Sequence, residues 1–175
     1  MLISNEMNAA MSEQIGNELA ASNQYVAIAV YFDGDGLPGL AKHFYRQASE
    51  ERTHAMRFVK LLVDSGGSPV IPEIPAPRTA FSSAEDAVRL SLDSEMRVTK
   101  QINALVDLAI KESDHLSKNA LEWFVNEQRE EVSSMDTLLR MVKRAGEQGL
   151  FFVENYLLHG GMTQAEAGME GAGAE

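Results

Sequence analysis

A proline-rich connection at residues 66–82 is the feature that most restricts what this chain can fold into. It reads GGSPVIPEIPAPRTAFS and holds four of the five prolines. Proline has no backbone N–H and cannot continue a helix, so we expect an extended stretch. About 17 extended residues reach at most ~56 Å, and a helix of roughly 28 residues is about 42 Å long. The connection can therefore run the whole length of a helix and leave the helices on either side of it parallel.

Four long segments place hydrophobic residues along one stripe, at spacings that alternate between four and three residues, which indicates amphipathic helices. We expect these helices at about 4–34, 38–65, 83–112 and 114–145. A DGDGLPG turn at 33–39 separates the first two. Ser82 followed by Glu85 predicts a capping box at the start of the third helix. Gly146 and Gly149 predict the end of the fourth.

A short hydrophobic stretch follows, LFFVENYLLHG at 150–160. It is too hydrophobic to lie free in water, so we expect a fifth helix over 149–159 that packs against other subunits. Residues 161–175 are small, polar or acidic and predict a flexible tail. The expected fold is all-α, with one domain over 1–160. It is a four-helix bundle with one long crossover between helices two and three, plus a short fifth C-terminal helix.

The composition excludes several classes of protein. The 175 residues include no cysteine, which excludes disulfides and thiolate metal sites and favours the reducing cytoplasm. The start of the chain has neither the basic segment nor the hydrophobic core of a signal peptide. The longest apolar run is too short to span a bilayer. The net charge of −11 argues against nucleic acid, whose phosphates select basic surfaces. We therefore expect no nucleic-acid and no membrane partner.

Polar residues interrupt the four hydrophobic stripes near their middles, and an offset of 77 residues relates these interruptions. The pairs so related are Glu18 and Glu95, Glu51 and Gln128, and His54 and Glu131. The sequence EERTH thus aligns with EQREE. We interpret the two helical hairpins as copies related by a pseudo-twofold axis, with these residues meeting at its centre.

Buried carboxylates without partners are very costly. No Lys or Arg lies on the same stripes to neutralise Glu18, Glu51, Glu95 and Glu131. Two divalent cations would balance these four negative charges, with His54 as a neutral nitrogen ligand. Oxygen-rich ligation with one imidazole suits Fe(II) or Mn(II) better than zinc. Di-iron carboxylate bundles use such a set, one Glu from each of two helices and Glu-x-x-His from each of the others. The first Glu-x-x-His copy is complete here, and the second has become Gln128 to Glu131.

Glu18, Tyr25, EERTH, Glu95 and WFVNEQREE, with the crossover and the short fifth helix, closely resemble a non-haem bacterial ferritin. The resemblance covers about residues 5–158. It implies the ferritin-like bundle fold and a ferroxidase that oxidises Fe(II) to Fe(III).

The resemblance also implies roles for single residues. One iron would be bound by Glu18, Glu51 and His54. The second would be bound by Glu95 and Glu131, with Glu51 bridging the two irons and Gln128 as a weak or indirect ligand. A third iron is expected beside them, near Glu50, Glu127 and Glu130. Tyr25 would form a hydrogen bond near the centre and supply an electron. We expect Trp123 to serve mainly in packing.

Two positions distinguish this chain from bacterioferritins. That branch has a histidine where this chain has Glu131, and a haem-binding methionine where this chain has Arg52. We therefore expect no haem.

The resemblance implies iron storage and detoxification inside a cytoplasmic homo-oligomeric cage of 24 subunits with octahedral symmetry. Iron and either O2 or H2O2 would be the substrates. Two alternatives remain open at this stage. One is a di-iron redox enzyme without a cage, of the peroxidase or oxygenase type, although a rubrerythrin should carry a cysteine-bound iron. The other is a module that only sequesters metal.

Overall fold

The computed structural model describes residues 2–161 of the chain. Its helices are α1 (Asn5–Gly34), α2 (Pro38–Asp64), α3 (Ala84–Lys111) and α4 (His115–Leu158). Over these residues no strand is assigned, and no helix combines the length and hydrophobicity that a bilayer span requires. The predicted all-α four-helix bundle is confirmed. Apart from Gly161, the tail predicted at 161–175 lies outside the described residues.

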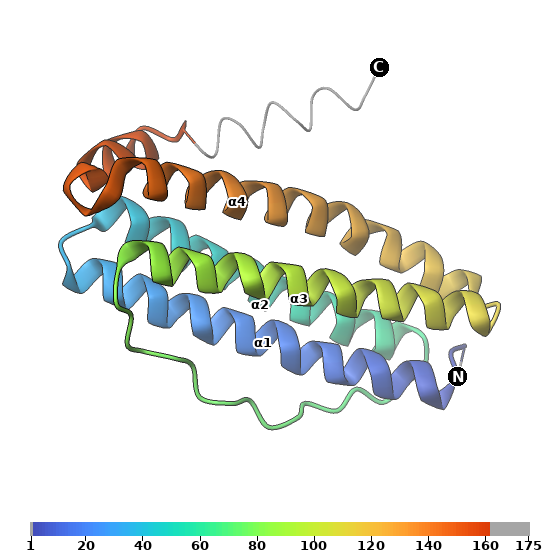
Figure 1. Cartoon of the computed structure of the whole chain (residues 1–175). Coiled ribbons are helices and arrows are strands. Elements are labelled where there is room, and N and C mark those ends of the chain that lie inside the picture. Colours follow the sequence, from blue (N-terminus) through green and yellow to red (C-terminus); the bar gives the residue numbers. More distant parts are fainter. Residues whose placement is uncertain (1, 162–175) are drawn as a thin grey trace, which may run out of the picture.

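The crossover, residues 65–83, joins α2 to α3 and leaves these two helices pointing in the same direction (Figure 1). α1 and α2 form one antiparallel hairpin, and α3 and α4 form the other. α1 also packs on α3, and α2 on α4, so the two hairpins close a bundle. The long connection thus makes α2 and α3 parallel, as predicted from its length.

The crossover is fastened along α1 by side chains of that helix. Asn8 exchanges two hydrogen bonds with Ser68, at 2.9 and 3.1 Å. Gln24 pairs in the same way with the backbone of Arg78, at 2.8 Å for both bonds. Between these anchors Gly16 allows close approach, because a Cβ at this position would lie 2.3 Å from Pro72 Cγ. This proline-rich segment is thus held by the side chains of its neighbour.

The start of α3 differs by one residue from the predicted capping box. Ser83, not Ser82, is the N-cap, and its hydroxyl accepts a hydrogen bond from Asp86 N at 3.0 Å. The Asp86 carboxylate in turn accepts hydrogen bonds from the backbone N and hydroxyl of Ser82. Two adjacent serines offer the same chemistry, and the direction in which the crossover arrives decides which one caps the helix.

The end of α4 is interrupted at Gly146, whose backbone dihedrals of φ 61° and ψ 174° are not helical. This conformation suits glycine and is strained for residues with a Cβ. The chain continues as helix on the far side of the break, so residues predicted as a separate fifth helix form the last part of α4. Gly149, which was expected to end the fourth helix, lies within this last part.

The segment after Gly146 is tied to the start of α2 by Glu154. The N-cap position of α2, Leu37, has no side chain that can accept a hydrogen bond. The buried Glu154 carboxylate accepts one bond each from Gly39 N and Leu40 N, both at 2.7 Å. A carboxylate at a helix N-terminus satisfies free N–H groups and interacts favourably with the helix dipole. Gly39 permits this contact, because a Cβ there would lie 3.0–3.2 Å from the backbone and carboxylate oxygens of Glu154.

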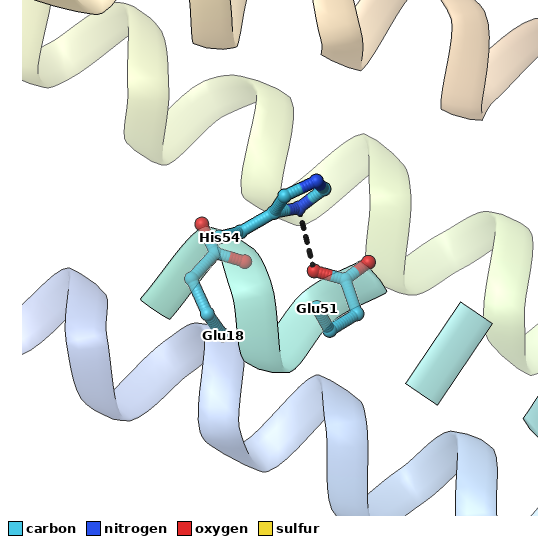
Figure 2. Close-up of side chains that lie close together, drawn as sticks. All are labelled: Glu18, Glu51 and His54. Atoms are coloured by element: carbon cyan, nitrogen blue, oxygen red, sulfur yellow. Dashed lines mark hydrogen bonds and ion pairs between the residues drawn. The ribbon is translucent and has the colours of Figure 1, made fainter. Parts of the chain in front are cut away.

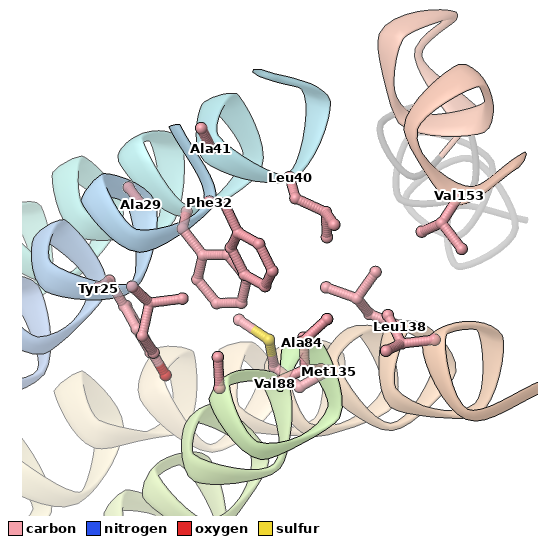
Figure 3. Close-up of a cluster of buried hydrophobic side chains, with 14 of the residues drawn as sticks. Tyr25, Ala29, Phe32, Leu40, Ala41, Ala84, Val88, Met135, Leu138 and Val153 are labelled. Atoms are coloured by element: carbon pink, nitrogen blue, oxygen red, sulfur yellow. The ribbon is translucent and has the colours of Figure 1, made fainter. Parts of the chain in front are cut away.

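The hydrophobic interior consists of two clusters along the bundle. The first is centred on Tyr25, Phe32, Phe44 and Leu138 and includes Val153 from beyond the break (Figure 3). The second contains Ile15, Phe58, Ile102, Leu121 and Phe124. The buried polar residues at the middle of each helix lie between them.

We predict that Glu154→Ala lowers the free energy of unfolding by about 1–3 kcal/mol, because two N–H groups of α2 lose a charged acceptor. Chemical denaturation measures this change. Glu122→Ala, which removes an exposed carboxylate of α4, is the matched control and should have little effect. Equal stability of the two variants would contradict the capping role.

Candidate metal centre

The buried layer between the two hydrophobic clusters receives one carboxylate from each helix. Glu18 comes from α1, Glu51 from α2, Glu95 from α3 and Glu131 from α4. The exposed fraction is 0% for Glu51 and Glu95, 1% for Glu18 and 6% for Glu131. The helical stripes thus bring together at one level four acids that are far apart in sequence.

Glu18, Glu51 and His54 form the first group that could hold a metal (Figure 2). One potential ligand atom from each residue lies within 4.8 Å of the others. Glu51 and His54 are one turn apart on α2, and His54 Nδ1 lies 3.2 Å from Glu51 Oε2. Glu18 reaches them from α1. This is the trio predicted for one iron.

His54, Glu127 and Glu131 form a second such group. The second ring nitrogen of His54, Nε2, lies 4.0 Å from Glu127 Oε1. Gln47 on α2 donates a 2.7 Å hydrogen bond to Glu131 Oε2. His54 therefore faces acids of both α2 and α4.

Glu51 is at the electrostatic centre of the layer. Burial raises the pKa of Glu51 well above its usual range, and the nearby carboxylates of Glu95, Glu18 and Glu131 raise it further. Burial also raises the pKa of Glu18 to about 7, although a 2.9 Å hydrogen bond from Gln14 opposes the shift. Glu51 thus lies near one carboxylate from each of the three remaining helices, as a carboxylate that bridges two metal ions requires.

Glu95 lies beside Glu51 but is in neither three-residue group. Its carboxylate accepts a hydrogen bond from the Tyr25 hydroxyl, which comes from α1. Burial raises the pKa of Tyr25 well above its usual value, and the charge of Glu95 adds to the effect. The fully buried Tyr25 therefore remains a protonated donor at neutral pH.

The remaining residues predicted for the site differ in their contacts with this layer. Gln128 is buried, and its side-chain oxygen accepts a 3.0 Å hydrogen bond from Thr99. Of the three acids expected near a third iron, Glu127 belongs to the second group with His54. Among residues 2–161, Glu50 and Glu130 belong to neither group, and they pair instead with Arg46 and Arg129, at 3.5 and 3.4 Å.

The donor atoms fit divalent metal ions. Within the described chain, Glu18 Oε2, Glu51 Oε1 and Glu95 Oε2 are buried without a hydrogen-bond partner. Three carboxylate oxygens without partners in one interior are costly unless protons or metal ions neutralise them. Burial, followed by the charge of Arg57, lowers the pKa of His54 to about 4, so its imidazole is neutral at physiological pH and can bind a metal.

Trp123 packs directly against this histidine. The two rings meet in a T-shaped contact with centroids 5.4 Å apart. The Arg57 guanidinium lies over the Trp123 ring, 3.7 Å from its centroid. This arrangement restricts the His54 ring and agrees with the predicted packing role.

Sequence reasoning missed three polar neighbours of the layer: Gln14, Gln47 and Thr99. Each lies four residues from a predicted ligand on the same helix, Gln14 from Glu18, Gln47 from Glu51 and Thr99 from Glu95. Residues four apart are neighbours on a helix surface. This spacing was the available signal, but Gln47 contacts Glu131 on another helix, which the spacing does not reveal.

Comparison with known proteins agrees with this geometry. A family profile described as a ferritin-like domain matches residues 8–145, most of the chain. The chain belongs to the ferritin family. It is 47% identical over 152 residues to Ferritin BfrB of Mycolicibacterium smegmatis, covering 87% of this chain and 83% of that protein. It is 31% identical over 156 residues to a bacterial non-heme ferritin of Bacteroides fragilis, covering 89% and 98%.

The fold is also shared with solved ferritins. An open-pore ferritin from Archaeoglobus fulgidus superposes with a TM-score of 0.87 at 32% identity, covering 89% of this chain and 96% of that one. The resemblance to bacterial ferritins predicted from the sequence is confirmed. Ferritin-family membership supports a role in iron storage.

We predict that the contribution of Glu18 to the stability of the metal-free form of this ferritin-family protein is lost as pH rises from about 4.5 to about 7. The pKa of Glu18 is higher in the folded state than its ordinary 4.5. The folded state therefore binds the Glu18 proton more tightly than the unfolded state does, and this contribution to stability is lost as the proton dissociates. Glu18→Gln should weaken this pH dependence in denaturation experiments. Glu13→Gln, an exposed change on the same helix, should preserve it. An identical pH dependence in wild type and Glu18→Gln would contradict the burial argument, because the lowered pKa values of His43 and His54 affect both proteins alike.

Proposed function

We propose that this protein is a ferroxidase that detoxifies and stores iron. The observation that carries the proposal is the set of buried, unpartnered oxygens of Glu18, Glu51 and Glu95 around one level of the bundle. The reaction is 4 Fe(II) + O2 + 4 H+ → 4 Fe(III) + 2 H2O, or its counterpart with H2O2, and iron is a substrate in both.

The residues of the layer have separate roles in this proposal. Glu18, Glu51 and His54 bind one Fe(II), Glu95 and Glu131 bind a second, and Glu51 bridges them. Gln14 and Gln47 orient the outer carboxylates through their hydrogen bonds to Glu18 and Glu131. Tyr25 donates a hydrogen bond to Glu95 and, in this proposal, supplies an electron. Glu127, whose Oε1 lies 4.0 Å from His54 Nε2, is the strongest contributor to a third iron position. No haem is required.

Storage requires a closed compartment, and the end of α4 offers a surface for assembly. Phe151 and Phe152 are 75% and 77% exposed, and Leu158 is 50% exposed. On the same segment Val153 and Glu154 are buried against the bundle, so the segment is held in place while its aromatic side faces outward. We propose that these side chains pack against other subunits in a homo-oligomeric cage of 24 subunits, located in the cytoplasm.

We predict that Glu51→Ala or His54→Ala slows Fe(II) oxidation much more than Glu130→Ala. The first two changes remove ligands from the buried layer, whereas Glu130 is paired with Arg129 outside both metal groups. Stopped-flow absorbance of Fe(III) formation in air measures the rates against a protein-free control. Equal rates for the three variants would place the site elsewhere. Wild-type oxidation no faster than the protein-free control would instead favour simple metal sequestration.

We predict that Phe151→Asp combined with Phe152→Asp reduces the protein to small oligomers, because charges replace the exposed aromatic side chains. Size-exclusion chromatography with light scattering measures the assembly. Met96→Asp, a charge at an exposed hydrophobic position of α3, is the control and should leave assembly intact. A wild-type protein that is itself a small oligomer at physiological salt would favour the alternative, a di-iron redox enzyme without a cage.

A further inference from the structure

A cavity of about 260 Å³ lies between α1, α3 and the crossover. Pro75, Ala76 and Pro77 of the crossover cover it, and Asn17 and Gln101 line it from the two helices. We call this space the crossover cavity. Its lining residues come from α1, α3 and the crossover. The crossover runs along the outside of the bundle from the end of α2 to the start of α3 (Figure 1).

The cover of the crossover cavity is held at both ends. Before it, Pro72 lies directly over Gly16 of α1. After it, Gln24 forms its two 2.8 Å hydrogen bonds with the backbone of Arg78. Pro75, Ala76 and Pro77 therefore span the crossover cavity between two fixed contacts, one at Pro72 and one at Arg78.

One side chain, Gln14, connects the crossover cavity to the metal centre. Its amide oxygen accepts a 3.2 Å hydrogen bond from Asn17, and its amide nitrogen is 3.5 Å from the side-chain oxygen of Gln101. Both of these partners line the cavity. The same amide nitrogen donates the 2.9 Å hydrogen bond to Glu18 Oε1. Gln14 thus contacts the wall of the cavity and a carboxylate of the centre at once.

The charge of the crossover cavity does not suit a metal cation. Its lining residues include no Asp or Glu, and the one charged side chain among them is Arg97. On the α2–α4 side, Glu50 and Glu130 pair with Arg46 and Arg129, but the carboxylates of Glu127 and Glu131 lie with His54 in a group that could hold a metal. A positive ion is favoured near those carboxylates and repelled by the guanidinium. The two faces of the bundle therefore favour different reactants.

We propose that the crossover cavity is the port through which a small uncharged oxidant, dioxygen or hydrogen peroxide, reaches the metal centre from the α1–α3 face. The inference rests on the proposed ferroxidase function, whose other reactant, Fe(II), approaches from the α2–α4 side, where Glu127 and Glu131 lie with His54. The amide side chains that bond to each other and to Glu18 can exchange those bonds with hydrogen peroxide, which donates and accepts hydrogen bonds. Neither neutral oxidant is repelled by Arg97. A separate route keeps the oxidant from meeting Fe(II) before both are at the site.

The test fills the crossover cavity with a bulky side chain. Ala20→Phe places a ring in the cavity from α1, and Ala76→Phe does so from the cover, so one variant remains if the other fails to fold. Ala27→Phe is the matched control, because Ala27 lies two turns further along α1, is similarly part-buried and does not line the cavity. Each assembled protein is loaded anaerobically with Fe(II) and then mixed in a stopped-flow instrument with O2 or with H2O2.

We expect the two filling variants to bind Fe(II) at the wild-type rate and stoichiometry, and to oxidise it several-fold more slowly at limiting oxidant. The oxidant whose reaction is slowed identifies which molecule uses the port. Unchanged oxidation with both oxidants would overturn the proposal. So would slower Fe(II) binding, which would make the cavity a metal route, or an equal loss in Ala27→Phe, which would indicate a general effect on the fold. A wild-type protein that binds Fe(II) but oxidises it with neither oxidant would instead disprove the ferroxidase function.

Discussion

Removal of carboxylates from water is the physical constraint on which the rest of this structure depends. Glu18, Glu51 and Glu95 are almost completely buried, and each has a side-chain oxygen without a hydrogen-bond partner among the described residues. Such a cluster is unfavourable unless protons or metal ions neutralise it, and burial accordingly raises the pKa of all three acids. The hydrophobic clusters on either side stabilise the helices that hold the acids together. The centre is therefore costly in the metal-free protein, and the binding of cations would relieve this cost.

The crossover determines how the four acids meet. Because it spans the bundle, α2 and α3 are parallel, and the middle of each helix arrives at the same level. A short turn in its place would make them antiparallel neighbours and change which helices are adjacent. The crossover also has a local effect, since its fixed path over Gly16 and beside Gln24 creates a cavity next to Glu18. One segment thus sets both the topology of the bundle and the shape of one approach to its centre.

The hydrophobic stripes predicted the helices, and their polar interruptions predicted which acids are buried together, because helical spacing alone decides which side chains share a face. Contacts between helices were harder to predict. Nothing near Gln47 indicates that it donates to Glu131, and nothing near Leu37 indicates that Glu154, on a distant segment, supplies the missing cap of α2. The Ser82 cap was wrong by one position because the choice between adjacent serines depends on the path of the crossover. The residues predicted as a fifth helix form a helix beyond the non-helical Gly146, and the range of α4 includes this helix because only one residue separates it from the longer one.

The sequence by itself determined the class of the fold, the parallel arrangement of α2 and α3, and the convergence of acids and one histidine. These follow from periodicity, chain length and the 77-residue offset, which are properties of the chain that need no coordinates. Only the tertiary structure decided that His54 lies between two groups of acids, that Gln14 joins Glu18 to a cavity, and that Glu50 and Glu130 pair with arginines. The physical reason is that periodicity fixes the direction of a side chain around its own helix. The rotation and axial shift of one helix against another are set by packing over the whole interior, and these decide which polar atoms come within bonding distance.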